Sequence, residues 1–293
     1  MRISTTESYH SRFCKVLEYI DMHLDGDLTV DQLSRISAFS KYHFHRQFSG
    51  LLGISVYKYV QLTRLKRAAY QLAFRDRSVI DVALANGYEN PESFARAFKK
   101  SFGQSPSEFK NQPQWEPWRL IYQPLSDIRS NFMNPQNQPE HVQLIIVEET
   151  KVAVLEHHGD PNLIGDSVRR FIEWRKQNNL SPQVSATFNI LYNNPSEISP
   201  KDYRLDICAA TEREVAENSF GVVEKTIPGG KCAVLQHIGS DVNLGESIMY
   251  LYSKWLPQSG EEPRDFPLYL QRVSFFPDVP EHEAITDVFL PLK

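Results

Sequence analysis

The sequence is poor in cysteine and lacks long apolar stretches. Its 293 residues include three cysteines, Cys14, Cys208 and Cys232, which are far apart and match no metal-ligand spacing. This excludes a disulfide scaffold and fits a reducing cytoplasm. No apolar run approaches the roughly 18–20 residues that a membrane span needs, and the first residues contain no apolar signal core. We therefore expect a cytoplasmic protein without a membrane partner.

Signatures of catalysis and metal binding are also scarce. The sequence contains no glycine-rich phosphate loop, no nucleophile elbow and no paired-cysteine motif. Glu156, His157 and His158 form the best candidate for a metal site, but neighbouring residues of a strand point to opposite faces. We therefore expect no metal, no cofactor, no catalytic residue and no enzymatic activity.

Charge and proline content divide the chain into two parts. Residues 1–112 carry 16 Lys and Arg against 11 Asp and Glu, whereas residues 113–293 carry 16 against 25. Such asymmetry predicts two domains with different partners, nucleic acid being the natural one for the basic half. Five prolines lie between residues 111 and 140, which predicts a connecting linker over 113–140. Trp115 and Trp118 indicate that part of this linker docks on a domain.

The two parts differ in hydrophobic period. Apolar residues before the linker recur every three or four positions, which is typical of helices. After the linker, short strand-like runs alternate with helical patterns over about 164–177 and 244–256. The predicted fold class is multidomain, with an all-α half followed by an α+β half.

The first half contains an internal repeat with a period of 50 residues. Asp31, for example, recurs as Asp81 and Gly53 as Gly103. Each copy predicts a short helix, a tight turn and a second helix, the first copy over 29–51 and the second over 79–101. This is the pattern of a helix-turn-helix, whose second helix can enter a DNA major groove.

The second helices of both copies have an apolar and a polar side. The apolar sides carry phenylalanines spaced by four, which we expect in the core: Phe44, Phe48, Phe94 and Phe98. The opposite sides carry Lys41, Tyr42, His45 and Arg46 in one copy, and Glu92, Ser93, Arg96, Lys99 and Lys100 in the other. One such side would be an ordinary solvated face, but two copies at a fixed spacing favour base reading. A single helix over 55–73, about 27 Å long, would separate the two readers, so one chain would bind two successive major-groove segments of double-stranded DNA as a monomer.

The motifs of residues 8–112 resemble the AraC/XylS transcription-regulator domain. The resemblance is carried by residues 28–53, by Arg64–Ala68 and, most specifically, by residues 83–106. It implies that Tyr42, His45 and Arg46 face bases in one groove, and that Asn90, Glu92, Ser93 and Arg96 face bases in the next. We expect an activator, with RNA polymerase as a further partner, and residues 1–112 to fold and bind DNA alone.

The second half contains its own repeat, with a period of 80 residues. Lys151–Gly159 is echoed by Lys231–Gly239, and each copy predicts a strand, a glycine turn, a helix and further strands. His157 and His237 are equivalent, which favours a shared structural role beside the turn. Residues 141–293 resemble the GyrI-like effector-binding domain, whose ligand pocket lies between two such repeats.

The pocket residues that we expect are an acid, an amide and several aromatics: Glu156, Trp174, Tyr192, Tyr269, Gln271 and Phe275. Any one of the aromatics would equally serve in the core. Gln271 stands where the resemblance places a glutamate, and a neutral amide cannot act as a general base. We therefore predict a transcriptional regulator that binds a neutral or anionic amphiphilic effector without turnover. The alternative is a small-molecule hydrolase or sequestering protein fused to a weak DNA-binding module.

Overall fold

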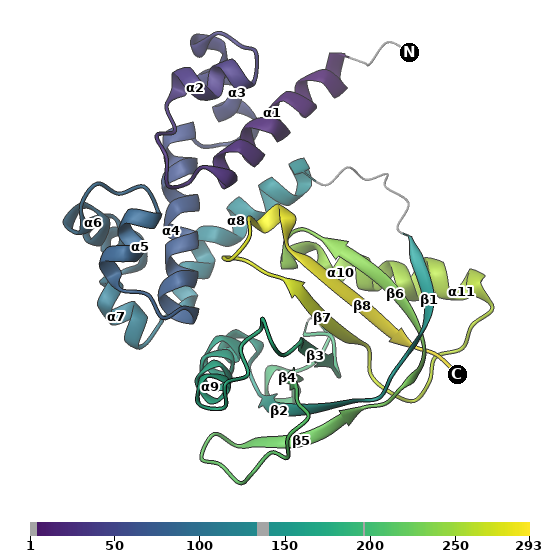
Figure 1. Cartoon of the computed structure of the whole chain (residues 1–293). Helices are drawn as coiled ribbons and strands as arrows, with labels where there is room; N and C mark the ends of the chain where they lie inside the picture. The colour runs from purple at the N-terminus through teal and green to yellow at the C-terminus, as the bar shows by residue number, and fades with distance from the viewer. Residues whose placement is uncertain (1–4, 134–140, 196) are drawn as a thin grey trace. The chain divides into compact units, whose positions relative to one another are not determined.

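Two units, one helical and one built on a β-sheet, make up the chain (Figure 1). The computed structural model describes residues 5–133, 141–195 and 197–293. The first unit comprises Met1–Asn137 and Pro280–His282, and the second comprises Gln138–Val279 and Glu283–Lys293. An all-α half followed by an α+β half, as the sequence predicted, is confirmed.

The helices of the first unit follow the periods read from the sequence. Their bounds are α1 (Thr5–Met22), α2 (Val30–Ile36), α3 (Lys41–Leu52), α4 (Val56–Phe74), α5 (Val79–Ala85), α6 (Pro91–Phe102), α7 (Pro106–Asn111) and α8 (Trp115–Met133). The predicted helix-turn-helix copies are α2–α3 and α5–α6. The helix expected between them is α4, displaced by one residue from the predicted bounds.

Caps explain where these helices begin and end. In α2, α3, α5 and α6 the capping side chain accepts a hydrogen bond from the backbone N–H three residues later; the caps are Thr29, Ser40, Ser78 and Asn90. Both second helices end at a glycine in the left-handed region, Gly53 at φ 69° and Gly103 at φ 75°. The same local chemistry therefore builds both copies.

The core of the first unit is made by the apolar sides of its helices. The four phenylalanines predicted to be internal are fully buried: Phe44, Phe48, Phe94 and Phe98. Leu65, Ala68 and Ala69 of α4 belong to the same apolar cluster. Each buried phenylalanine contributes on the order of 1.5–3 kcal/mol of transfer free energy, so the polar sides of α3 and α6 must face outward.

Helix α8 corrects the prediction of a linker over 113–140. Tyr122 is 1% exposed, and its hydroxyl donates a 2.8 Å hydrogen bond to the carbonyl of Leu62 in α4. Trp118 packs 5.0 Å from the Tyr122 ring. Pro124 lies inside the helix, because tertiary packing outweighs the backbone hydrogen bond that proline removes. The stretch packs as an element of the first unit, and residues 134–140 lie outside the described residues.

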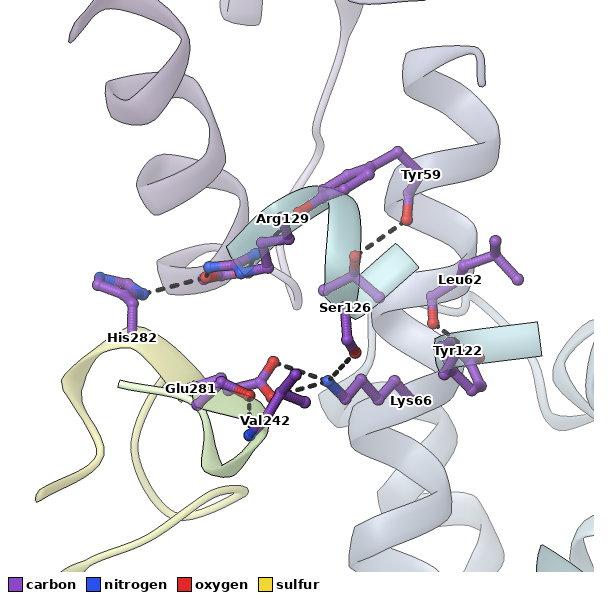
Figure 2. A network of polar contacts seen from close by, with 12 residues as sticks. Tyr59, Leu62, Lys66, Tyr122, Ser126, Arg129, Val242, Glu281 and His282 are labelled. Carbon is purple, nitrogen blue, oxygen red and sulfur yellow. Dashed lines mark hydrogen bonds and ion pairs between the residues drawn. The ribbon is translucent and has the colours of Figure 1, made fainter. Parts of the chain in front are cut away.

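A buried polar network ties α8 to α1 and α4 (Figure 2). Arg129 of α8 donates hydrogen bonds to Asp21, with 2.9 Å to its Oδ1, and to the hydroxyl of Tyr59 at 2.8 Å. Although burial opposes its charge, the neighbouring Asp21 carboxylate holds the pKa of Arg129 above the usual value. His282, which belongs to this unit, lies 3.0 Å from Asp21 Oδ2.

A second ion pair completes the network. The Lys66 ammonium of α4 lies 2.7 Å from a carboxylate oxygen of Glu281 and 3.3 Å from the Ser126 hydroxyl of α8. Lys66 is therefore an internal residue. Although it lies among the basic residues of Arg64–Arg67, its ammonium is not available to DNA.

The second unit contains one antiparallel sheet of eight strands. Their bounds are β1 (Val142–Val147), β2 (Thr150–His158), β3 (Thr187–Leu191), β4 (Arg204–Ala210), β5 (Val222–Ile227), β6 (Gly230–Ile238), β7 (Tyr269–Ser274) and β8 (Ile285–Pro291). The order across the sheet is β1-β6-β8-β7-β3-β4-β2-β5. The equivalent strands of the two repeats are β1 and β5, β2 and β6, β3 and β7, and β4 and β8. When each strand is replaced by its equivalent, the order is the same read from either end, so the predicted duplication is confirmed.

The first strand of each repeat pairs with the other repeat. β1 pairs with β6 of the second repeat, and β5 pairs with β2 of the first. Strands β3 and β7 join the two halves at the centre of the sheet. Neither repeat is therefore a complete sheet by itself.

Helices cover one face of the sheet. The helix predicted over 164–177 is α9 (Ile164–Gln177), whose Phe171 and Trp174 pack on β2 and β4. The one predicted over 244–256 is divided into α10 (Leu244–Tyr250), a π-helical turn over Leu251–Trp255 and α11 (Leu256–Ser259). Pro257 has no N–H to continue the α-helical hydrogen bonds, which is the physical reason for the break.

The other face carries an apolar cluster whose buried members, among the residues that the structure describes, all lie in strands. We call it the strand-only face, and its buried members are Val152, Val154, Phe188, Ile190, Cys208, Ile227, Cys232, Tyr269 and Phe289. Tyr192 and Phe266 pack against it. Its members come from both repeats, whereas a ligand groove between the repeats stays a prediction.

Candidate DNA-reading helices and effector site

The outward side of α3 carries the predicted base-reading residues. Lys41, Tyr42, His45 and Arg46 are all exposed. Tyr42 has 77% of its surface exposed, although it is a large aromatic residue with apolar area to bury. An aromatic residue beside an arginine on an outward helix face suits contact with a thymine methyl and a guanine edge.

The outward side of α6 repeats this arrangement with different residues. Glu92, Arg96, Lys99 and Lys100 are exposed, and the two lysines lie in the last turn of the helix. The Asn90 side-chain oxygen accepts from the backbone N–H of Ser93 at 2.8 Å, while the Ser93 hydroxyl donates to the Asn90 carbonyl at 2.9 Å. Both residues therefore build the start of α6, and neither bond uses the amide N–H groups of Asn90.

Arg64 is a positioning residue whose role was not deduced from the sequence. Its guanidinium donates to the carbonyls of Leu24 at 2.9 Å, Gly26 at 2.6 Å and Gly87 at 3.3 Å. The turn of the second helix-turn-helix is thereby fixed to α4. Gly87 has φ +70°, and a Cβ there would lie 2.6 Å from Arg64, so the close approach requires glycine.

The two repeat-equivalent histidines of the second unit have the same structural role, as predicted. His157 Nδ1 lies 2.9 Å from the Ser167 hydroxyl, and its Nε2 lies 3.2 Å from the Asp160 carbonyl. The His237 nitrogens meet Ser247 and Ser240 in the same way, both at 3.0 Å. Because a carbonyl only accepts, Nε2 carries the proton in the neutral ring. Each histidine joins a strand to the helix that follows it.

The strand-only face continues into a polar group that we call the charged corner, made of Glu156, Arg204, Asp206 and Lys225. Glu156 pairs with Asp206 across β2 and β4, and Asp206 pairs with Ile190 of the apolar cluster. The Lys225 ammonium donates to Asp206 Oδ2 at 2.7 Å and also bonds Glu156. Hydrogen bonds from Lys225 and then His158 lower the pKa of Glu156 to about 2.

Asp206 is the residue of this site that sequence reasoning missed. Its side chain is fully buried, and it also accepts a 2.9 Å hydrogen bond from the Tyr192 hydroxyl. Burial, followed by this contact with Asp206, raises the pKa of Tyr192. The available signal was a single aspartate in an otherwise apolar run over residues 205–210, which predicts a buried charge that needs a partner.

The structure brings four of the six predicted pocket residues to the strand-only face and its margin. Glu156 and Tyr192 lie at the charged corner, Tyr269 is in the apolar cluster, and Gln271 pairs with Phe188 of that cluster. Trp174 is instead a residue of α9, buried against the opposite face of the sheet and stacked on Phe171. Phe275 follows the end of β7.

In residues 5–133, 141–195 and 197–293 no group of three or more His, Cys, Asp or Glu is placed to hold a metal ion. None of the helices in that part of the chain is long and apolar enough to cross a membrane.

Both halves of the chain match known domain families. Residues 33–112 match a helix-turn-helix domain, and residues 141–293 match the GyrI-like small molecule binding domain. A probable transcriptional regulator of Escherichia coli K12, YgiV, is 34% identical over 152 residues, which cover 52% of this chain and 95% of that protein. The transcriptional regulator Rob of Salmonella typhimurium is 24% identical over 251 residues, 83% of each chain.

Solved structures of similar proteins include the EcmrR–DNA complex, with a TM-score of 0.45 and 13% identity over 90% of this chain and 98% of that one. The family matches account for both described units, the tandem helix-turn-helix and the duplicated sheet. The chain belongs to the GyrI-like family and is an AraC-type helix-turn-helix transcriptional regulator with a GyrI-like small-molecule-binding domain.

Proposed function

We propose that the chain is a sequence-specific activator that reads two successive major-groove segments as a monomer. Support comes from the two outward helix sides, since α3 and α6 each expose arginine in equivalent positions of one chain. α4 has 19 residues, a length of about 27 Å, which is comparable with one duplex turn of about 34 Å. The three cysteines are free, which fits action in a reducing cytoplasm.

The proposed base-reading and phosphate-binding residues are those of the two outward sides. They are Lys41, Tyr42, His45, Arg46, Asn90, Glu92, Ser93, Arg96, Lys99 and Lys100. The arginines and Tyr42 read base edges, and the lysines bind phosphates. Because an activator acts by assisting the polymerase at its promoter, RNA polymerase is the proposed protein partner.

The strand-only face is the proposed effector site, with Glu156, Tyr192, Tyr269 and Gln271 among its residues. The apolar cluster suits the tail of an amphiphile, and the charged corner beside it suits a polar head. The head would be neutral or anionic, because both carboxylates of the corner already hold cations. Gln271 cannot act as a general base, which supports binding without turnover.

Footprinting on genomic fragments tests this function. We expect a protected site spanning two successive major grooves, with occupancy that changes when a neutral or anionic amphiphile is added. Sedimentation of the labelled complex should give one chain per site. Occupancy only by dimers, or a footprint that no amphiphile alters, would contradict the corresponding part of the proposal.

A further inference from the structure

Lys225 is placed where a bound cation would be expected. Its ammonium bonds one carboxylate that is fully buried, Asp206, and a second, Glu156, that is one-third exposed. Lys225 itself keeps 26% of its side chain exposed, so it reaches the corner from a strand margin that solvent can enter. A buried carboxylate is costly unless a cation compensates it.

The surroundings of Lys225 are also those that organic cations favour. The Tyr192 ring borders the corner, and the Arg204 guanidinium carbon lies over it, 3.9 Å from the ring centroid. The apolar cluster lies directly beside it, since Lys225 pairs across the strands with Val152. An aromatic ring, a desolvated carboxylate and an apolar wall together attract an ammonium with an apolar tail.

The charges of the corner balance with Lys225 in place. Glu156 and Asp206 contribute two negative charges, and Arg204 and Lys225 contribute two positive ones. Arg204 does not fully compensate Asp206, because the Arg204 Nε and Asp206 Oδ1 atoms are 3.8 Å apart and neither has a hydrogen-bond partner among the described residues. Removal of Lys225 would leave a net negative charge beside the apolar face.

The fold itself does not require this lysine. In the second repeat, register places Ile145 at the position of Lys225, and Gln236 and Asp287 at those of Glu156 and Asp206. There the Gln236 amide donates a 3.0 Å hydrogen bond to Asp287. The same sheet thus forms the equivalent corner with an amide and an apolar residue, so the charged version in the first repeat needs another explanation.

We propose that Lys225 is a specificity-determining residue whose ammonium occupies the place of a cationic ligand head. The site consequently rejects organic cations and accepts neutral or anionic amphiphiles. This inference rests on the proposed effector site and names the residue that sets its ligand class.

Calorimetric titration of the full chain with three ligands of equal tail length tests the inference. The probes are decyltrimethylammonium, decyl maltoside and decanoate, all kept below micelle-forming concentrations. Lys225→Met, which removes the charge and keeps an unbranched chain, should bind the ammonium at least tenfold more tightly than the parent does. Lys151→Met is the matched control, because Lys151 forms an exposed ion pair with Glu224 on the same two strands.

Two further variants keep the test decisive if Lys225→Met fails to fold. Glu156→Gln leaves a net positive corner and should bind decanoate several-fold more tightly, with no gain for the ammonium. The double variant Glu156→Gln, Lys225→Ile copies the corner of the second repeat. It should lose most of the increase in ammonium affinity that Lys225→Met shows. An ammonium affinity of folded Lys225→Met within twofold of the parent overturns the inference, as does a decanoate affinity of Glu156→Gln that is unchanged.

The parent chain separates this inference from the proposed function. Binding of the ammonium by Lys225→Met supports the inference even if the parent binds none of the three probes. A parent that binds neither decyl maltoside nor decanoate contradicts the amphiphile class of the proposed function. A parent that binds the ammonium most tightly contradicts both.

Discussion

At the scale of single residues, the outward arginines of α3 and α6 carry the proposed base reading. Arg46→Ala and Arg96→Ala should each cost about 1–3 kcal/mol of binding free energy and relax preference at one base position. Lys99→Ala should weaken all sequences alike and flatten the salt dependence. Fluorescence anisotropy with specific and random duplexes measures both effects, and the exposed Arg213 of the second unit, changed to Ala, is the control. Unaltered discrimination in both arginine variants would disprove the groove assignment.

Glu156 should make the stability contributed by the charged corner depend on pH in the acidic range. Its pKa in the folded chain is about 2, below the value of about 4.3 expected when unfolded. A depressed carboxyl pKa contributes stability that is present above the unfolded pKa and is lost as pH falls through the folded one. The contribution is small, because the side chain is one-third exposed and solvent screens it.

Glu156→Gln should therefore show a shallower loss of thermal stability than the parent between about pH 4.3 and pH 2. Melting followed by circular dichroism at several pH values measures this difference. The exposed Glu149, changed to Gln, should leave the parent's slope unaltered. Parallel curves for Glu156→Gln and the parent would show that the ion pair with Lys225 does not contribute.

At the scale of elements, α8 shows why composition misled the domain boundary. Proline density correctly marks broken backbone hydrogen bonds, but it carries no information about which apolar side chains find partners. Tyr122 and Leu125 are buried in the core of the first unit. Trp115 and Trp118 correctly predicted that part of the stretch docks on a domain, since aromatic side chains of that size are rarely left solvated.

A DNA-binding fragment that ends at residue 112 should accordingly be less stable than one that ends at residue 137. In the full chain, Tyr122→Ala should cost about 3–5 kcal/mol, as for other large core residues, and Tyr122→Phe about 1 kcal/mol for the lost hydrogen bond to Leu62. Leu120, which is 75% exposed, provides a neutral control on the same helix. Denaturant unfolding measures the stability of both fragments and of the Tyr122 variants. Equal stability of the two fragments would mean that α8 is only a linker.

At the scale of the whole chain, internal repeats and hydrophobic periods predicted the fold. Which residues lie at the candidate sites depends on which side chains are buried in the folded chain. Local sequence was enough for the helix-turn-helix copies, because capping residues and glycine ends are local chemistry. It was not enough for Asp206 or Trp174, whose positions depend on which face of a strand or helix meets a neighbour far along the chain. The family resemblance predicted Gln271 as a pocket residue, and strand pairing places it beside the apolar cluster. Lys225 was recognised only from the pairing of β5 with β2.

Strand exchange has a consequence for how the second unit unfolds. Because β1 completes the second repeat and β5 completes the first, damage to one repeat should destabilise both. Trp174→Ala removes a side chain of α9 that is 4% exposed and should cost about 3–5 kcal/mol. Native-state hydrogen exchange should then show lower protection in β6 and β8 as well as in β2 and β4. Met249→Ala on α10, 55% exposed, should change neither pair of strands. Loss confined to β2 and β4 would mean that the repeats open independently, and that the continuous sheet does not couple them.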